Sequence, residues 1–207
     1  MNYDFIEKRT QYRTAIIQRY GVSAAIFDNV TRALAALAQP VSLRRGQYLQ
    51  TIGKMTPSLY WLCSGVARVG YITEAGEEVT LGFSTDGQAV GLHEDWLRAR
   101  AGEPAVHFVV AETAIHGYRL DWSKVQLLSA ENRALREYYV KVSESSIVRQ
   151  GQRIYVSRSA SARGRLQAFR AEYPGLEARI SQKVIASFLG ITPQYLSQLL
   201  RENESAK

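Results

Sequence analysis

The sequence has little of what several classes of protein require. It contains one cysteine, Cys63, and five prolines among 207 residues. A single cysteine excludes an internal disulfide framework and a four-cysteine metal or iron–sulfur site supplied by one chain. No run approaches the roughly 18 apolar residues of a membrane span. Residues 1–13 carry charges where a signal peptide needs an apolar run. We therefore expect a cytoplasmic protein with no membrane partner, in which Cys63 is a buried strand thiol.

Sequence patterns of catalysis are also missing. No nucleophile elbow, phosphate-binding loop or metal dyad occurs, and His93, His107 and His116 have neither metal nor haem spacing. The acidic pair Glu94 and Asp95 is explained as the charged first turn of a helix. The sequence therefore predicts a protein that is not an enzyme and has no cofactor.

The net charge of +7 is distributed unevenly. Residues 141–207 hold eleven Lys or Arg against five Glu, whereas residues 1–140 hold fifteen basic and fourteen acidic side chains. Such asymmetry favours a polyanion as partner of the C-terminal third. Charge alone leaves a second interpretation open, in which these side chains only keep helices soluble.

Helices are predicted at the N-terminus. Apolar residues recur every three to four positions over residues 2–20, and Gly21 follows as a helix end. Residues 28–37 predict a second helix.

The pattern changes after Val41 to short apolar segments separated by closely spaced glycines, which is typical of a β-roll or barrel. The clearest hairpin covers residues 66–83, with Gly76 in its turn. Residues 106–120 predict another pair of strands.

A long helix is predicted over residues 123–156. Its residues Leu135, Tyr139, Val142 and Ile154 approximate a seven-residue apolar seam. The periodicity fits a dimer interface and a helix packed on its own β-roll equally well.

The C-terminal segment carries the most informative pattern. A basic helix over residues 159–172 is followed by two short helices within residues 180–201. Ser181 caps the first, Gly190 ends it, and Thr192 caps the second. Their apolar positions close a small core and are Ile185, Ala186, Leu189, Ile191, Leu196 and Leu199. This is a helix-turn-helix pattern, although an ordinary helical hairpin has similar turns.

The second short helix has one polar face. Gln194, Ser197, Gln198 and Arg201 recur at i, i+3, i+4 and i+7, where a helix in a major groove contacts bases. Glutamine suits adenine edges, and Arg201 attracts phosphate.

Three further side chains join this candidate DNA interface. Tyr195 can stack on a sugar or contact a thymine methyl, and Ser181 and Thr192 lie where helix N-termini hold phosphates. For each side chain the alternative is a solvated polar residue.

The order of these elements resembles the Crp/Fnr superfamily of bacterial transcription regulators. The resemblance rests on residues 43–49 (LRRGQYL), 62–68 (LCSGVAR), 73–78 (TEAGEE) and 180–201. It implies an α+β chain with a cyclic-nucleotide-binding-like β-roll sensor (residues 1–122), a long connecting dimerisation helix (123–156) and an all-α helix-turn-helix domain (157–207). It also implies homodimers on near-palindromic double-stranded operators, with RNA polymerase as a further partner.

The sequence departs from the family where a cyclic nucleotide would bind. The family's Gly-Glu pair and Arg-Ala/Ser pair are not evident, since Leu92 follows Gly91, and Pro104 and Ala105 stand where the arginine is expected. A buried phosphate without a fixed cation is costly. Arg98 or Arg100 could replace that cation, but both lie in a short exposed helix. We therefore expect no tight binding of cyclic AMP, and the effector is unidentified.

The chain ends six residues after Arg201, so no extended wing is expected after the recognition helix.

The alternative function is a ligand-binding or protein-interaction β-roll whose helical tail docks a protein partner.

Overall fold

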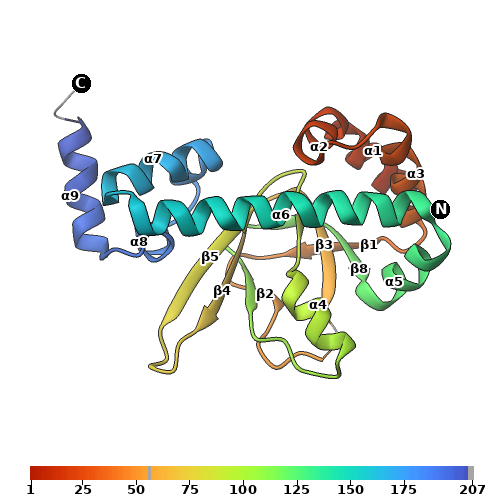
Figure 1. Cartoon of the computed structure of the whole chain (residues 1–207), viewed down its shortest axis with the longest axis horizontal. Helices are drawn as coiled ribbons and strands as arrows, with labels where there is room; N and C mark the ends of the chain where they lie inside the picture. Colours follow the sequence, from red (N-terminus) through yellow and green to blue (C-terminus); the bar gives the residue numbers. More distant parts are fainter. Residues whose placement is uncertain (56, 205–207) are drawn as a thin grey trace. The chain divides into compact units, whose positions relative to one another are not determined.

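The computed structural model describes residues 1–55 and 57–204, the side chains of residues 203 and 204 excepted. Its elements in chain order are α1 (Tyr3–Gln11), α2 (Arg13–Tyr20), α3 (Ala24–Ala35), β1 (Gln39–Leu43), β2 (Tyr48–Gln50), β3 (Ser58–Ser64), β4 (Ala67–Ile72), β5 (Glu78–Ser84), β6 (Ala89–Val90), α4 (His93–Arg100), β7 (Phe108–Ala111), β8 (Ile115–Asp121), α5 (Trp122–Glu131), α6 (Arg133–Ser159), α7 (Ala162–Glu172), the 3₁₀ helix η1 (Leu176–Ala178), α8 (Gln182–Leu189) and α9 (Pro193–Glu204) (Figure 1). The chain divides into two compact units, Met1–Val69 with Phe83–Ile147, and Gly70–Gly82 with Val148–Lys207. The mixed α+β class is as expected.

Two four-stranded sheets form the β-roll, in the orders β1-β8-β3-β6 and β2-β7-β4-β5. The 66–83 hairpin is confirmed, and Gly76 has the positive φ of 79° that its turn needs. The strands within 106–120 form as predicted but do not pair with each other, because β7 joins one sheet and β8 the other. Strand β8 pairs with β1 and β3, and a Cβ at Gly117 would lie 2.2 Å from the Trp61 carbonyl oxygen.

The single helix expected over residues 2–20 is broken at Tyr12. The Tyr12 ring packs edge-on against Trp61 at 5.8 Å, and its hydroxyl donates to the Cys63 carbonyl oxygen at 2.8 Å. This tertiary contact removes Tyr12 from the helical pattern. Cys63 is a strand residue but only half-buried, and burial raises the pKa of its thiol to about 11. Helix α3 begins earlier than expected because Ser23 caps it.

The continuous helix expected over residues 123–156 is also wrong. Asn132 is extended (φ −110°, ψ 104°), and its side chain accepts from the Leu135 N–H at 2.9 Å, so a new helix, α6, begins at Arg133. Leu135 is buried in the core of the first unit, and Tyr139 packs against Trp122 at 5.7 Å. This half of the predicted seam therefore faces the unit's own core.

Aromatic side chains dominate that core. Trp96 of α4 stacks on Trp122 at 4.0 Å, and Phe5 of α1 packs edge-on against Trp61 and Tyr118. Figure 1 shows α1, α2 and α3 beside the N-terminal part of α6, where Arg9 Nη2 donates to the Tyr138 hydroxyl. Burial of such rings is the main stabilising term of this unit.

Glu94 and Asp95 lie in the first turn of α4, as expected, but Asp95 also has a structural role inside the unit. Asp95 is fully buried and accepts from Gln50 Nε2 (2.6 Å), Val106 N (3.0 Å) and His107 Nδ1 (3.1 Å). Although burial alone raises it, these hydrogen bonds hold the pKa of Asp95 below its ordinary value. Asp95 thus ties α4 to the neighbouring strands.

Of the described residues, no helix combines the length and apolar character needed to cross a bilayer.

Candidate nucleic-acid interface

The second unit contains the helix-turn-helix, with α8 and α9 joined by a tight turn (Figure 1). Gly190 ends α8 in the left-handed region (φ 64°), and the Ile191 N–H donates to the Ala186 carbonyl at 3.1 Å. Ser181 Oγ accepts from Val184 N at 3.4 Å, and Thr192 Oγ1 accepts from Tyr195 N at 3.2 Å. Both caps and the turn therefore lie where the sequence predicts them.

The two helices share a closed apolar core. Ile185, Ala186 and Leu196 have no exposed surface, and Leu189 and Leu199 are buried. The small side chain of Ala186 lets α8 and α9 approach closely. Ile191 is only half-buried.

This packing fixes which side of α9 meets solvent. With Leu196 and Leu199 turned inward, the exposed side chains of the helix include Gln194, Tyr195, Gln198 and Arg201. Ser197 is half-buried. We call Gln194, Tyr195, Ser197, Gln198 and Arg201 the recognition face.

Two members of the recognition face are already engaged. Gln198 Nε2 donates to Glu202 Oε1 at 2.9 Å, and Arg201 Nε donates to the Ser197 carbonyl oxygen at 3.4 Å. Tyr195 keeps 44% of its surface exposed, which leaves its ring available for stacking.

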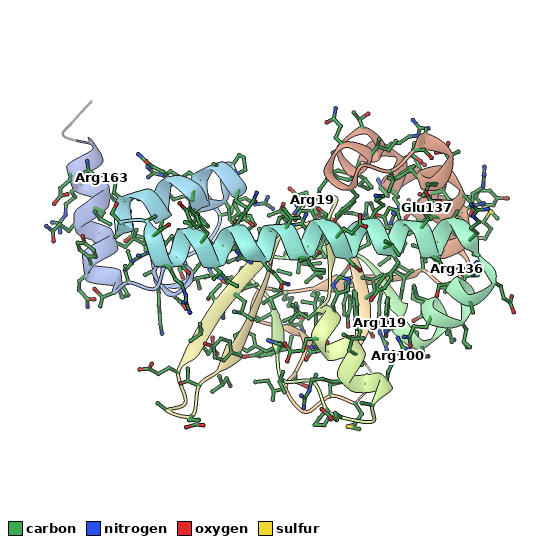
Figure 2. The ribbon with its side chains drawn as sticks, in the orientation of Figure 1. Arg19, Arg100, Arg119, Arg136, Glu137 and Arg163 are labelled. Carbon is green, nitrogen blue, oxygen red and sulfur yellow. The ribbon has the colours of Figure 1, made fainter. Side chains whose placement is uncertain are left out.

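The sequence interpretation missed two residues beside this face. Glu202 lies one turn after Gln198 on α9, and its other carboxylate oxygen is 3.4 Å from Arg163 Nη2 of α7. Figure 2 labels Arg163 next to α9. The i, i+4 spacing of Gln198 and Glu202 was a usable signal, whereas Arg163 is 39 residues away.

Part of the positive charge of this unit is used internally. Arg165 donates to the carbonyl oxygens of Leu189 and Ala160, and Arg170 forms a bidentate pair with Glu177 at 2.7 and 2.9 Å. Lys183, by contrast, is exposed in the first turn of α8. A cation there suits phosphate contact beside the Ser181 cap.

The end of the β4–β5 hairpin belongs to the same unit and is bonded to α8. Ser187 Oγ accepts from the Thr80 N–H at 3.0 Å and lies 3.3 Å from the Glu78 carbonyl oxygen, to which it donates. Arg153 of α6 donates to the Leu81 carbonyl oxygen and lies 4.7 Å from the Phe188 ring centroid. The Ser187 bonds join residues more than a hundred positions apart, and the bond from Arg153 to Leu81 spans 72 positions, so the sequence pattern gives no sign of them.

The arginines considered for a phosphate site in the β-roll differ in availability. Arg98 Nε donates to the Pro104 carbonyl oxygen at 2.9 Å, and Arg98 Nη2 pairs with Glu103 at 3.0 Å. Arg100 is exposed and borders a cavity of about 130 Å³. A third guanidinium, Arg68, is buried and pairs with Glu112 at 2.5 Å.

No protein-family model matches the sequence, and no curated protein matches it. The fold is similar to solved structures. FixK2 from Bradyrhizobium japonicum has a TM-score of 0.69 at 15% identity, over 82% of this chain and 85% of its own. The c-di-GMP-responsive global regulator CLP of Xanthomonas campestris has a TM-score of 0.65 at 13% identity, over 89% and 93%. A putative Crp/Fnr-family transcriptional regulator from Eubacterium rectale has a TM-score of 0.67 at 15% identity, over 90% and 85%. Of these neighbours, the second is called a global regulator and the third a putative transcriptional regulator.

Proposed function

The chain has the fold of the Crp/Fnr transcription regulators, and from this premise we propose that it is a sequence-specific DNA-binding regulator acting as a cytoplasmic homodimer. The observation that carries the proposal is the recognition face, a set of exposed polar side chains on a helix whose opposite side is locked by Leu196 and Leu199. A helix held this way can enter a major groove without losing its core.

Each site residue has a role that its position supports. Gln194 and Gln198 read adenine edges through N6 and N7, Tyr195 contacts a sugar or a thymine methyl, and Ser197 donates or accepts at a base edge. Arg201 attracts phosphate. Ser181 and Thr192 cap the two helices, whose N-terminal N–H groups hold phosphate oxygens.

An apolar stripe on α6 supports the homodimer. Its members keep 51% to 72% of their surface exposed and are Val140, Ile147, Val148, Ile154 and Tyr155. Val140, Ile147 and Ile154 are seven residues apart, so they lie on one face of the helix. This stripe replaces the seam that the sequence placed at Leu135, Tyr139, Val142 and Ile154, of which only Ile154 is retained. Apolar side chains that recur every seven residues form a seam, and the α6 helix of a second copy would bury this seam.

A glycine on the same face supports the same conclusion. Gly151 lies within α6, and a Cβ added there would meet no atom of the described residues within 4 Å. Glycine inside a helix costs about 0.5–1 kcal/mol relative to alanine, and packing within the chain does not explain it. Close approach of a second α6 explains it. A two-fold interface then places two copies of α9 on half-sites of a near-palindromic operator.

Residues 1–122 are proposed as the sensor, 123–156 as the connecting segment and 157–207 as the DNA reader. The sensor is not proposed to bind cyclic AMP tightly, because the buried Arg68 is already paired with Glu112 and Arg98 is held by Glu103 and Pro104. The sensor responds to an unidentified small molecule or to none, and RNA polymerase is a further partner implied by the resemblance.

The test is a selection of bound duplexes from a randomised pool over a series of salt concentrations. We expect a palindromic consensus and an affinity that falls steeply with salt. Gln194→Ala should weaken the consensus site by about 1–3 kcal/mol and random DNA very little. The matched control is Gln167→Ala, which removes an exposed glutamine from α7. Salt-insensitive or absent retention would favour the alternative, in which the helical tail docks a protein.

A further inference from the structure

Glu202 holds the amide of Gln198 on one side and the guanidinium of Arg163 on the other. Gln198 Nε2 lies 2.9 Å from Oε1 of the carboxylate, and Arg163 Nη2 lies 3.4 Å from Oε2. The two oxygens of one carboxylate are thus bound by partners on different helices, which restricts its rotation. All three side chains are exposed among the residues that the structure describes.

The chemistry of the carboxylate decides which way the glutamine amide faces. A carboxylate oxygen only accepts hydrogen bonds, whereas the amide has one accepting oxygen and two donating N–H groups. The amino group of Gln198 must therefore face Glu202. The carboxylate repels Oε1 of Gln198. It therefore accepts its hydrogen bond from the N–H of the amide that points away from that oxygen.

The opposite edge of the amide is left for DNA. That edge presents Oε1, an acceptor, beside the second N–H, a donor. Adenine offers the matching pair in the major groove, a donor at N6 and an acceptor at N7, whereas guanine offers two acceptors at O6 and N7. A glutamine free to rotate could turn its amino group toward guanine, but one fixed by Glu202 meets guanine with its oxygen.

Resting on the proposed DNA-binding function, we propose that Glu202, held by Arg163, is a specificity-determining positioning residue that fixes Gln198 to read adenine and reject guanine. Glu202 does not touch the base. Its carboxylate also repels phosphate, so removing it raises affinity for all DNA. The ratio of affinities for two bases at one position, not affinity itself, is therefore the informative quantity.

The experiment first identifies the base that Gln198 reads. This is the operator position at which wild type prefers one base and Gln198→Ala has lost that preference. Affinities of the full-length protein are then measured for two duplexes that differ there by adenine or guanine. Wild type should prefer adenine about ten-fold or more. In Glu202→Ala this ratio should fall about three- to ten-fold at that position only, and in Arg163→Ala it should fall less, because an exposed ion pair contributes modestly.

The matched control is Glu177→Ala. It also removes one carboxylate, the partner of Arg170, and therefore changes the net charge by the same amount. It should raise affinity for both duplexes and leave their ratio unchanged. An unchanged ratio in Glu202→Ala, or guanine as the preferred base in wild type, would overturn the proposal. Absence of any sequence preference in wild type is a different result, because it would reject the proposed function itself.

A readout without DNA separates positioning from charge. In the free protein, the side-chain amide proton of Gln198 that is bonded to Glu202 should have an NMR shift different from that of an unconstrained glutamine and a slowed exchange with water. Both should approach values of an unconstrained glutamine in Glu202→Ala and stay unchanged in Glu177→Ala. An unconstrained amide in wild type would contradict the positioning role.

Discussion

Replacing Ile147 with alanine should strongly weaken the proposed dimer without unfolding the chain. Ile147 lies in the middle of the apolar stripe on α6 and keeps 68% of its surface exposed. Alanine is the best helix former, so the helix itself should not suffer. The perturbation therefore removes apolar surface that only a second copy would bury.

The magnitude follows from that exposed surface. Complete burial of an isoleucine side chain contributes about 1.5–3 kcal/mol, and about two thirds of this is gained only on association. Each protomer loses about 1–2 kcal/mol, and a two-fold interface counts the loss twice. The dimer should lose about 2–4 kcal/mol, which weakens dimerisation about 30- to 700-fold.

Sedimentation velocity over a range of protein concentrations measures this change directly. The control is Leu127→Ala, since Leu127 is 72% exposed but lies on α5 and not on the stripe. That variant should dimerise like wild type. The reasoning is refuted if Ile147→Ala dimerises as tightly as wild type, or if both variants weaken the dimer equally.

Three further predictions concern buried hydrogen bonds. Because the folded state holds the pKa of Asp95 below its ordinary value, its stabilising effect is present above the unfolded pKa near ~4 and is lost as pH falls through the folded pKa; Asp95→Asn should lower stability by about 1–3 kcal/mol at pH 7, and urea titrations should show the difference from wild type shrinking in acid. Glu112→Gln removes the carboxylate that pairs with the buried Arg68 at 2.5 Å, and thermal unfolding should show a loss of about 3–5 kcal/mol, whereas a loss below about 1 kcal/mol would contradict the pairing. Ser187→Ala removes the acceptor of the Thr80 N–H, so hydrogen exchange of that amide should accelerate; unchanged protection would show that the hairpin is held by other contacts.

The helix-turn-helix could be predicted almost completely from the sequence because its signals are local. The Ser181 and Thr192 caps each bond an N–H three residues away, and Gly190 ends α8 by its own backbone freedom. Such bonds form within one turn of chain, so the identity of the nearby residues is enough to predict them.

Helix boundaries in the first unit were less predictable, for two different reasons. Tyr12 leaves the helix to reach Trp61 and Cys63, which lie about fifty residues away. Asn132 carried a local signal for a helix start, since asparagine caps helices through its side chain. The signal was missed because the residues on both sides of Asn132 have a helical composition.

The sequence by itself determined the class of each segment, the turn and caps of the helix-turn-helix, and the polar face of α9, because these depend on residue type and spacing over a few positions. Tertiary structure alone decided which faces are covered. A seven-residue seam accommodates Leu135 and Tyr139, four residues apart, as well as Ile147 and Ile154, seven apart, and only packing against the β-roll shows that the first pair is inside. It also decided that Glu202 meets Arg163, because residues distant in sequence become neighbours only when the chain folds.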